Sequence, residues 1–259
     1  MFNGRRQPSC GGTSRTMREY QVRICERLGV KFPGSTRPHA PYMKVPAHTL
    51  VPLPDELSFA AGAAISCGTG TAYQALRRMN VSGRDTIAVI GQGPVGLSAT
   101  QLAAHMGARV IALDVSPQRL ARAKEFGAAA PINPALDDAV AGIKALTNGM
   151  GADMTLDTSG AAEGRVIAVR ATKAWGTACF VGEGGNVTLD VSPDLLRKQL
   201  TIVGSWTFST VVQADCARFI AERKITVDDL FTHRWQLREA EEAYQVFDRQ
   251  TDGKGVFMM

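Results

Sequence analysis

The stretch that most constrains the fold of this chain is VIGQGPVG, in which Gly91, Gly93 and Gly96 form the pattern G-x-G-x-x-G. It follows TIAVI, an apolar run typical of a buried strand, and it leads into PVGLSATQLAAHMG, which has the spacing of a helix. In this context Gly91 permits a tight turn, Gly93 lets the backbone approach a pyrophosphate, and Gly96 allows the helix to pack closely on the strand. Pro94 and Val95 lie in the first helical turn, whose unpaired N–H groups attract phosphate.

A single acidic residue, Asp114, ends the next apolar run, 18 positions after Gly96. A carboxylate at this place accepts hydrogen bonds from the hydroxyls of an adenosine ribose, and its charge repels a 2′-phosphate. The pattern therefore predicts a site for NAD rather than NADP. Arg119, on the first turn of the following helix, is a candidate to cover the adenosine end of the cofactor, and the alternative is a solvated surface charge.

The fold class follows from the alternation of apolar and amphipathic segments after Asp85. Six apolar runs separated by helical patterns predict an α/β fold, in which a doubly wound parallel sheet of the Rossmann type is covered by helices on both faces. Residues 42–54 alternate short β-like stretches with prolines, as in an irregular antiparallel sheet. Residues 58–78 have Ala-rich helical spacing around a glycine loop, and the texture changes again from Val211.

Composition excludes several classes of function. The formal net charge of +5 comes from residues spread along the 259 positions, and the only dense basic cluster lies in the first two dozen residues. We therefore expect no nucleic-acid partner. The sequence contains no apolar run of the length that a bilayer requires, so we expect no membrane partner. Five irregularly spaced cysteines argue against a disulfide framework and favour a reducing compartment, and we therefore expect a cytoplasmic protein.

Seven blocks in order resemble the medium-chain dehydrogenase/reductase superfamily, and within it the zinc-type alcohol and polyol dehydrogenases. The resemblance runs from about Tyr42 to the C-terminus and implies an oxidoreductase that transfers hydride between an alcohol, polyol or hydroxy acid and NAD. It also implies a GroES-like β-barrel catalytic domain and a homo-oligomer joined near TIVGSWTF. On this basis we assign residues 1–66 to a remnant of the catalytic domain, 67–207 to the NAD-binding domain and 208–259 to a return to the catalytic domain. The blocks are YMKVPAHTLVPLPDELSFAAGAAISCGTGTAYQAL, GQGPVGLSATQLA, ALDVSPQRLARAKEFGA, LDTSG, FVGEGG, LTIVGSWTFS and THRWQLREAEEAYQVF.

The resemblance also implies roles for individual residues at the reacting end of the cofactor. Cys67 matches the third ligand of a catalytic zinc, and Thr71 matches a residue that lies against the nicotinamide. Other matches lie at expected strand ends, and the alternative for each is an ordinary turn. These are Ser159, Val181, Gly182, Glu183 and Ser205, with the backbone of Val181 and Glu183 expected to hold the carboxamide.

The sequence departs from the family at its zinc sites. It contains no Gly-His-Glu, and the cysteines ahead of Cys67 are Cys10 and Cys25, which correspond by position to the structural-zinc lobe. We therefore expect a chain that begins about a third of the way into a complete family member, with zinc absent or incompletely bound. Two other functions stay open: a catalytically dead NAD-binding protein or fragment, and a zinc-free reductase of the quinone-reductase branch, against which Cys67 argues.

Overall fold

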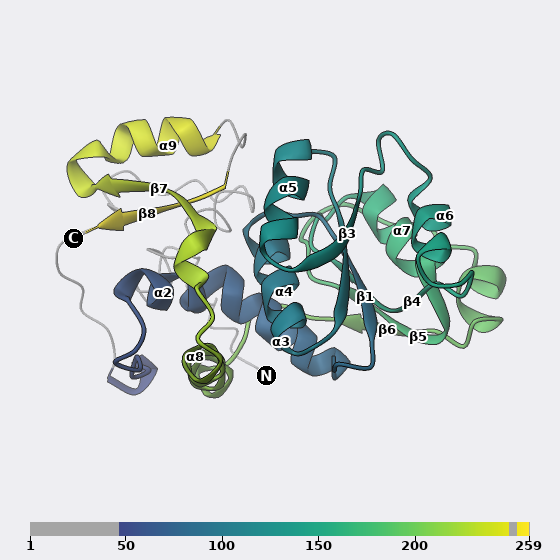
Figure 1. The fold of residues 1–259 in the computed structure, drawn as a ribbon, viewed down its shortest axis with the longest axis horizontal. Helices are drawn as coiled ribbons and strands as arrows, with labels where there is room; N and C mark the ends of the chain where they lie inside the picture. Colours follow the sequence, from purple (N-terminus) through teal and green to yellow (C-terminus); the bar gives the residue numbers. More distant parts are fainter. Residues whose placement is uncertain (1–46, 249–252, 259) are drawn as a thin grey trace, which may run out of the picture.

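A parallel sheet of six strands forms the centre of the computed structural model, which describes residues 47–248 and 253–258 (Figure 1). The strand order is β3-β2-β1-β4-β5-β6, and each neighbouring pair is parallel. This confirms the predicted doubly wound fold, whose strand order reverses between β1 and β4. The strands are β1 (Thr86–Ile90), β2 (Arg109–Leu113), β3 (Ala128–Ile132), β4 (Ala152–Asp157), β5 (Thr172–Phe180) and β6 (Thr201–Gly204).

Strand β1 illustrates why these runs form central strands. Successive side chains point to opposite faces, so Ile87 and Val89 join one apolar core while Ala88 and Ile90 join the other. All four of these residues are buried. Because both faces are covered, the strand needs no alternation of polar and apolar residues.

Helices cover both faces of the sheet (Figure 1). The helices of the described residues are α2 (Phe59–Ala64), α3 (Gly70–Met79), α4 (Pro94–His105), α5 (Pro117–Glu125), α6 (Ala139–Ala145), α7 (Ala162–Ala171), α8 (Thr210–Arg223) and α9 (Ala240–Asp248), of which α9 packs on β7 and β8 instead. Leu102 of α4 and Ala123 of α5 belong to one core, whereas Ile143 of α6 and Ala168 of α7 belong to the other. Within the described ranges, no helix has the length and apolar character needed to cross a membrane.

Residues 59–79 form one helical run, which corrects the predicted glycine loop. The π-helical segment η2 (Ile65–Thr69) joins α2 to α3, and Gly70 has helical angles of φ −63° and ψ −38°. Glycine is needed here for close packing, because a Cβ at Gly70 would lie 2.7 Å from ring atoms of Phe208. Ser58 begins the run by accepting a hydrogen bond from the Ala61 N–H.

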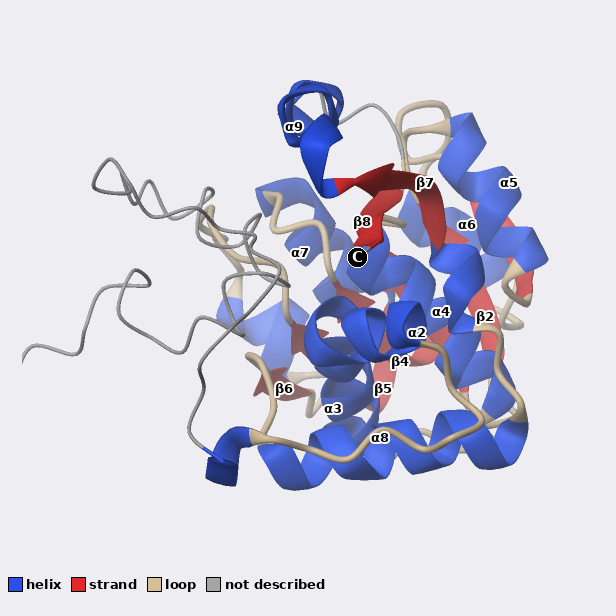
Figure 2. Cartoon of the chain, turned by 90° about the vertical axis from the view of Figure 1, so that its left-hand side faces the viewer, coloured by secondary structure: helices blue, strands red, loops and turns tan. Residues whose placement is uncertain are grey.

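Helix α8 lies against the outer side of this helical run, and Figure 2 shows it crossing below α2 and α3. The Tyr73 hydroxyl on α3 donates to Asp215 on α8 over 2.8 Å. The chain that follows the sheet is therefore joined to the segment that precedes the sheet. Two further short helical segments are η3 (Val191–Leu196) and η4 (Val227–Leu230).

The C-terminal residues form a separate pair of strands, β7 (Phe231–Gln236) and β8 (Lys254–Met258), joined by η5 (Leu237–Glu239) and α9 (Figure 1). They pair in parallel, and β8 contacts α2. The antiparallel sheet predicted over 42–54 is wrong for residues 47–54, which contain η1 (Ala47–Thr49) and no strand. Pro52 and Pro54 have no N–H to donate to a ladder. Residues 42–46 lie outside the described part.

Candidate cofactor site

The predicted site residues gather at one edge of the sheet, where the strands end. Because the six strands are parallel, the loops after β1, β2, β4, β5 and β6 meet at this edge, beside the reversal of strand order. Backbone hydrogen bonds extend the ladder into these loops and fix their relative positions. The N–H groups of Gly91, Thr158, Val181 and Ser205 donate over 2.8, 2.9, 2.9 and 3.0 Å to the carbonyls of Leu113, Ile90, Asp157 and Phe180.

The three glycines of the motif serve three different needs. Gly91 has φ +88°, and a Cβ there would lie 3.0 Å from the Ser159 nitrogen. A Cβ at Gly96 would lie 1.8 Å from the Gly91 carbonyl oxygen, so helix and turn approach each other more closely than any side chain allows. Gly93 has nothing within 4 Å of its Cβ position, which leaves the backbone open to a ligand.

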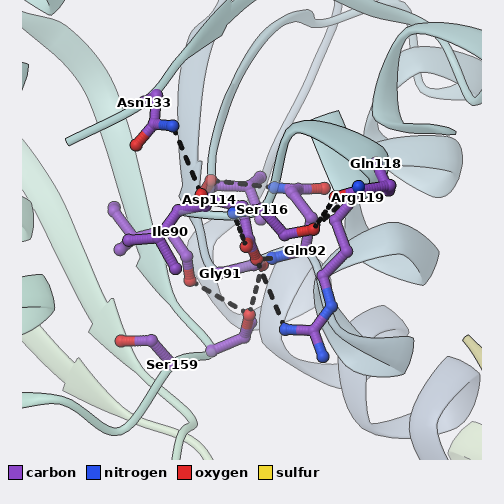
Figure 3. A network of polar contacts seen from close by, with 12 residues as sticks. Ile90, Gly91, Gln92, Asp114, Ser116, Gln118, Arg119, Asn133 and Ser159 are labelled. Carbon is purple, nitrogen blue, oxygen red and sulfur yellow. Dashed lines mark hydrogen bonds and ion pairs between the residues drawn. The ribbon is translucent and has the colours of Figure 1, made fainter. Parts of the chain in front are cut away.

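Asp114 holds the turn together from the neighbouring strand (Figure 3). Its buried carboxylate accepts the Gln92 N–H on Oδ2 over 2.6 Å and the Ser116 N–H on Oδ1 over 2.8 Å. The Arg119 guanidinium lies 3.8 Å from Oδ2. The structure therefore places Asp114 and Arg119 together beside the glycine turn.

Gln92 belongs to this site and was missed by sequence reasoning. Its side chain is fully buried, with Nε2 donating to the Val89 carbonyl and Oε1 accepting from the Thr100 hydroxyl, each over 2.9 Å. These bonds anchor the glycine turn to β1 and α4. The motif leaves this position variable, so the sequence carried no signal for it.

Asp157, at the end of β4, organises a second turn. Its fully buried carboxylate accepts the Ser159 N–H over 3.0 Å, the Ser159 hydroxyl over 2.6 Å and the Gly160 N–H over 3.3 Å. Burial raises the pKa of this carboxyl, although these hydrogen bonds and Arg165 act in the opposite direction. Sequence reasoning named Ser159 and not Asp157. The position of Asp157 was a usable signal, because this acidic residue lies at the end of β4 just as Asp114 lies directly after β2.

The loops after β4 and β5 meet backbone to backbone. A Cβ at Gly182 would lie 2.2 Å from the Gly160 nitrogen, and a Cβ at Gly160 would lie 2.2 Å from the Glu183 carbonyl oxygen. Gly160 also has φ +71°, where a side chain is strained. This packing places Val181, Gly182 and Glu183 beside the turn that contains Ser159.

Ser205 lies at the end of β6 with an unsatisfied polar atom. The residue is 4% exposed, and its Oγ has no hydrogen-bond partner among the described residues. A buried hydroxyl without a partner is costly, by roughly 1–3 kcal/mol. A polar group of a ligand at this edge would supply the missing bond.

Cys67 and Thr71 lie next to the glycine turn, on η2 and the first turn of α3. Both are buried, and the Thr71 hydroxyl donates to the Cys67 carbonyl over 2.9 Å. A Cβ at Gly68 would lie 3.5 Å from Val95 Cγ2, so this segment packs against the start of α4. Single π-helical turns inside longer helices are frequent at functional sites.

The donor set for zinc is incomplete in the part of the chain that the structure describes. In residues 47–248 and 253–258 no group of three or more His, Cys, Asp or Glu side chains could hold a metal ion. Cys67 therefore has no sufficient set of co-ligands there, and we derive no step through a metal. Cys10 and Cys25 lie outside the described residues.

A dinucleotide fits the residues that are present. Gly93 leaves open space at the start of α4, Asp114 retains acceptor capacity beside its two backbone bonds, and Ser205 presents an orphaned hydroxyl at the far end of the same edge. These features lie on either side of the reversal of strand order, where open α/β sheets bind ligands.

Comparison with known proteins matches residues 94–222 to the family model described as zinc-binding dehydrogenase. The chain is 42% identical over 220 residues to the uncharacterized zinc-type alcohol dehydrogenase-like protein YphC of Escherichia coli strain K12, covering 84% of this chain and 62% of the relative. It is 31% identical over 210 residues to sorbitol dehydrogenase 1 of Saccharomyces cerevisiae, covering 78% and 58%. The solved structure of alcohol dehydrogenase TADH from Thermus sp. ATN1 superimposes with a TM-score of 0.74 at 29% identity, covering 80% and 60%. The chain thus spans about 60% of the length of these relatives.

Proposed function

This chain belongs to the zinc-type alcohol dehydrogenases of the medium-chain dehydrogenase/reductase superfamily, and on that premise we propose that it binds NAD at the carboxyl edge of its six-stranded sheet. The reaction we propose is hydride transfer between a small alcohol, polyol or hydroxy acid and NAD. The bound cofactor supplies the hydride chemistry, and the residues of this chain bind and orient it. The observation that carries the proposal is the sterically required glycine turn at the reversal of strand order, bonded to Asp114.

The start of α4 is suited to the pyrophosphate. Gly93 is its N-cap, no side chain caps the first turn, and the Cβ position of Gly93 is open. Backbone N–H groups without partners and the positive end of the helix dipole attract phosphate oxygens. Pro94, which lacks an N–H, occupies a position where that donor is not needed.

Asp114 is suited to the adenosine ribose. A carboxylate has about four acceptor positions, and two backbone N–H groups account for only part of them. Its remaining lone pairs accept the ribose hydroxyls, and its charge disfavours a 2′-phosphate. Arg119 beside it covers the adenosine end of the cofactor.

The nicotinamide end lies at the loops after β5 and β6 in this proposal. The backbone of Val181 and Glu183 holds the carboxamide, Ser159 and Gly182 shape the neighbouring turn, and the Ser205 hydroxyl gains its missing partner. Thr71 positions the ring from the side of η2. Cys67 is the zinc ligand that the family resemblance assigns, and the packing of its neighbour Gly68 against Val95 supports a place near the cofactor.

A second candidate function is NAD binding without turnover. It is favoured by the donor set around Cys67, which lacks sufficient co-ligands in the described ranges. Both candidates require the same cofactor site, so they differ in turnover and in zinc content.

We also propose an assembly of two or more copies, joined through the edge of β6. Strand β6 is the last in the sheet order and pairs only with β5 among the described strands. Ile202 on β6 is 41% exposed and Trp206 after it is 63% exposed. We propose that the NAD-binding domain spans residues 67–207, so the edge of β6 that joins the copies belongs to this domain.

The test of the cofactor site is a fluorescence titration with NADH and NADPH, together with zinc analysis and an assay of alcohol-dependent NAD reduction. We expect saturable binding that favours NADH, and an Asp114→Asn variant should bind NADH roughly 10-fold more weakly because charge-assisted hydrogen bonds are lost. Asp55→Asn, at an exposed position, is the matched control. Absence of NADH binding by the unmodified chain would refute the proposal. NADH binding without alcohol-dependent turnover and without stoichiometric zinc would select the second candidate.

A further inference from the structure

Arg165 is a largely buried arginine on α7 that none of the sequence motifs includes. Its side chain is 11% exposed and reaches from the helix to the turns that follow β4 and β5. Burying a guanidinium is costly unless its donors are satisfied, so the identity of its partners is informative.

Two of these partners lie on the loop after β5. Nη1 donates to the Gly185 carbonyl and Nη2 donates to the Gly182 carbonyl, each over 2.7 Å. No other side chain of the described residues is hydrogen-bonded to residues 182–185. The planar guanidinium is therefore a clamp that fixes two carbonyls of one loop at a set separation.

The third partner is Asp157, the fully buried carboxylate at the end of β4. Its Oδ2 lies 3.7 Å from Arg165 Nε, too far for a hydrogen bond, and Nε has no other partner. The pair is thus held by charge, while Asp157 bonds the turn of Ser159 and Gly160. One arginine consequently links the turn after β4 to the loop after β5.

The clamped loop needs such a restraint. Gly184 and Gly185 have φ values of +85° and +61°, and glycines in this region have many accessible backbone conformations. Without the two bonds from Arg165, the carbonyls of Gly182 and Gly185 would have no side-chain partner among the described residues. The glycine turn after β1 has its own anchors, Gln92 and Asp114, whose hydrogen bonds do not involve Arg165.

We infer that Arg165 is a positioning residue that preforms the nicotinamide half of the cofactor site, while the ADP-ribose half is preformed by the separate network of Gln92 and Asp114. This inference rests on the proposed NAD site. It implies that the two halves of the cofactor respond differently to a change at Arg165.

The test compares binding of NADH with binding of ADP-ribose, which lacks the nicotinamide. Arg165→Lys is the principal variant, because an ammonium keeps a positive charge near Asp157 but cannot hold two carbonyls in a planar fork. We expect its affinity for NADH to fall about tenfold while its affinity for ADP-ribose stays within about twofold of the unmodified chain. The fluorescence enhancement of bound NADH, which reports the surroundings of the nicotinamide, should fall as well.

Two further variants complete the design. Arg165→Met leaves Asp157 uncompensated, so it should lose stability in addition to NADH affinity. Arg170→Met, on the same helix, removes a half-exposed arginine paired with Asp194 and should change the affinity for neither NADH nor ADP-ribose. Equal losses for NADH and ADP-ribose in Arg165→Lys, or no loss for either, would overturn the inference. An unmodified chain that binds neither ligand would overturn the proposed function, and the inference with it. If the unmodified chain binds both ligands, the proposed site stands, and the affinities of Arg165→Lys alone decide the role of Arg165.

Discussion

At the scale of single residues, Trp175 stands out because it adopts a conformation that suits glycine. Its φ is +64° and its side chain is 73% exposed, within an irregular part of β5 where the register to β4 shifts. The left-handed region costs an ordinary residue roughly 1–2 kcal/mol, and an exposed side chain recovers little of that through packing. We expect Trp175→Gly to stabilise the chain by about 0.5–1 kcal/mol after allowing for the entropy of glycine in the unfolded chain.

The measurement is urea unfolding followed by circular dichroism, which does not rely on the fluorescence of the replaced tryptophan. Trp175→Ala is the control, because it removes the same exposed ring and keeps the strained backbone. A Trp175→Gly variant no more stable than Trp175→Ala would show that the backbone at this position carries no strain worth relieving.

Residues differ in how far the sequence could predict them, for a physical reason. Gly91 and Gly96 were predictable because the steric conflict lies within one motif. Arg165 was not, because its partners lie 17 and 20 positions away and their proximity is created by the fold. Predictions of roles for Cys67 and Thr71 came from family resemblance and stay predictions.

At the scale of elements, one carboxylate joins three strands at the amino ends of the sheet. Asp153 on β4 accepts the Thr86 N–H of β1 over 2.7 Å and pairs with Lys173 of β5. Burial acts to raise the pKa of Asp153, but the bonds from Lys173 and Thr86 outweigh it, so the pKa lies below the ordinary value of 3.8. A carboxyl with a lowered folded-state pKa stabilises the fold above its unfolded pKa, and this contribution is lost as pH falls through the folded pKa.

We therefore expect the free energy of unfolding to change little from about pH 7 to about pH 5 and to fall below about pH 4. Asp153→Asn should lose about 1 kcal/mol at neutral pH and show a smaller further loss in acid, because its bonds no longer depend on ionisation. Urea unfolding at several pH values measures both effects, and Asp55→Asn, exposed and away from the strands, should follow the unmodified chain. Identical acid losses in Asp153→Asn and the unmodified chain would contradict the assignment.

The elements themselves were predicted best where burial is complete. The six strands were predictable because runs such as TIAVI are apolar on both faces, whereas the helix through Gly68 and Gly70 was misread as containing a loop. Glycine signals a turn in isolated sequence, but here it permits the approach of Phe208 and Val95 from segments that the sequence does not place. The proline-rich residues 47–54 were misread in the opposite sense, because extended character does not supply a strand partner.

At the scale of the whole molecule, the edge of β6, which pairs only with β5 among the described strands, favours assembly with a second copy. An open strand edge presents unpaired backbone groups, and the exposed side chains of Ile202 and Trp206 add apolar area beside it. Two such edges related by a two-fold axis would bring the same residues of both copies together. In Ile202→Lys the new ammonium would then lie near its own copy across the axis, and like charges brought together at an interface repel each other.

We expect the unmodified chain to form a dimer and Ile202→Lys to weaken that dimer roughly 10- to 100-fold, as light scattering after size-exclusion chromatography at two protein concentrations would measure. Leu136→Lys places the same charge at an 80% exposed position after β3, the opposite edge of the sheet, and should leave the dimer intact. A monomeric unmodified chain, or equal dissociation by both lysine variants, would exclude the β6 edge as the interface. Because the loop with Ser205 follows β6 directly, retained NADH binding by monomeric Ile202→Lys would further separate assembly from the cofactor site.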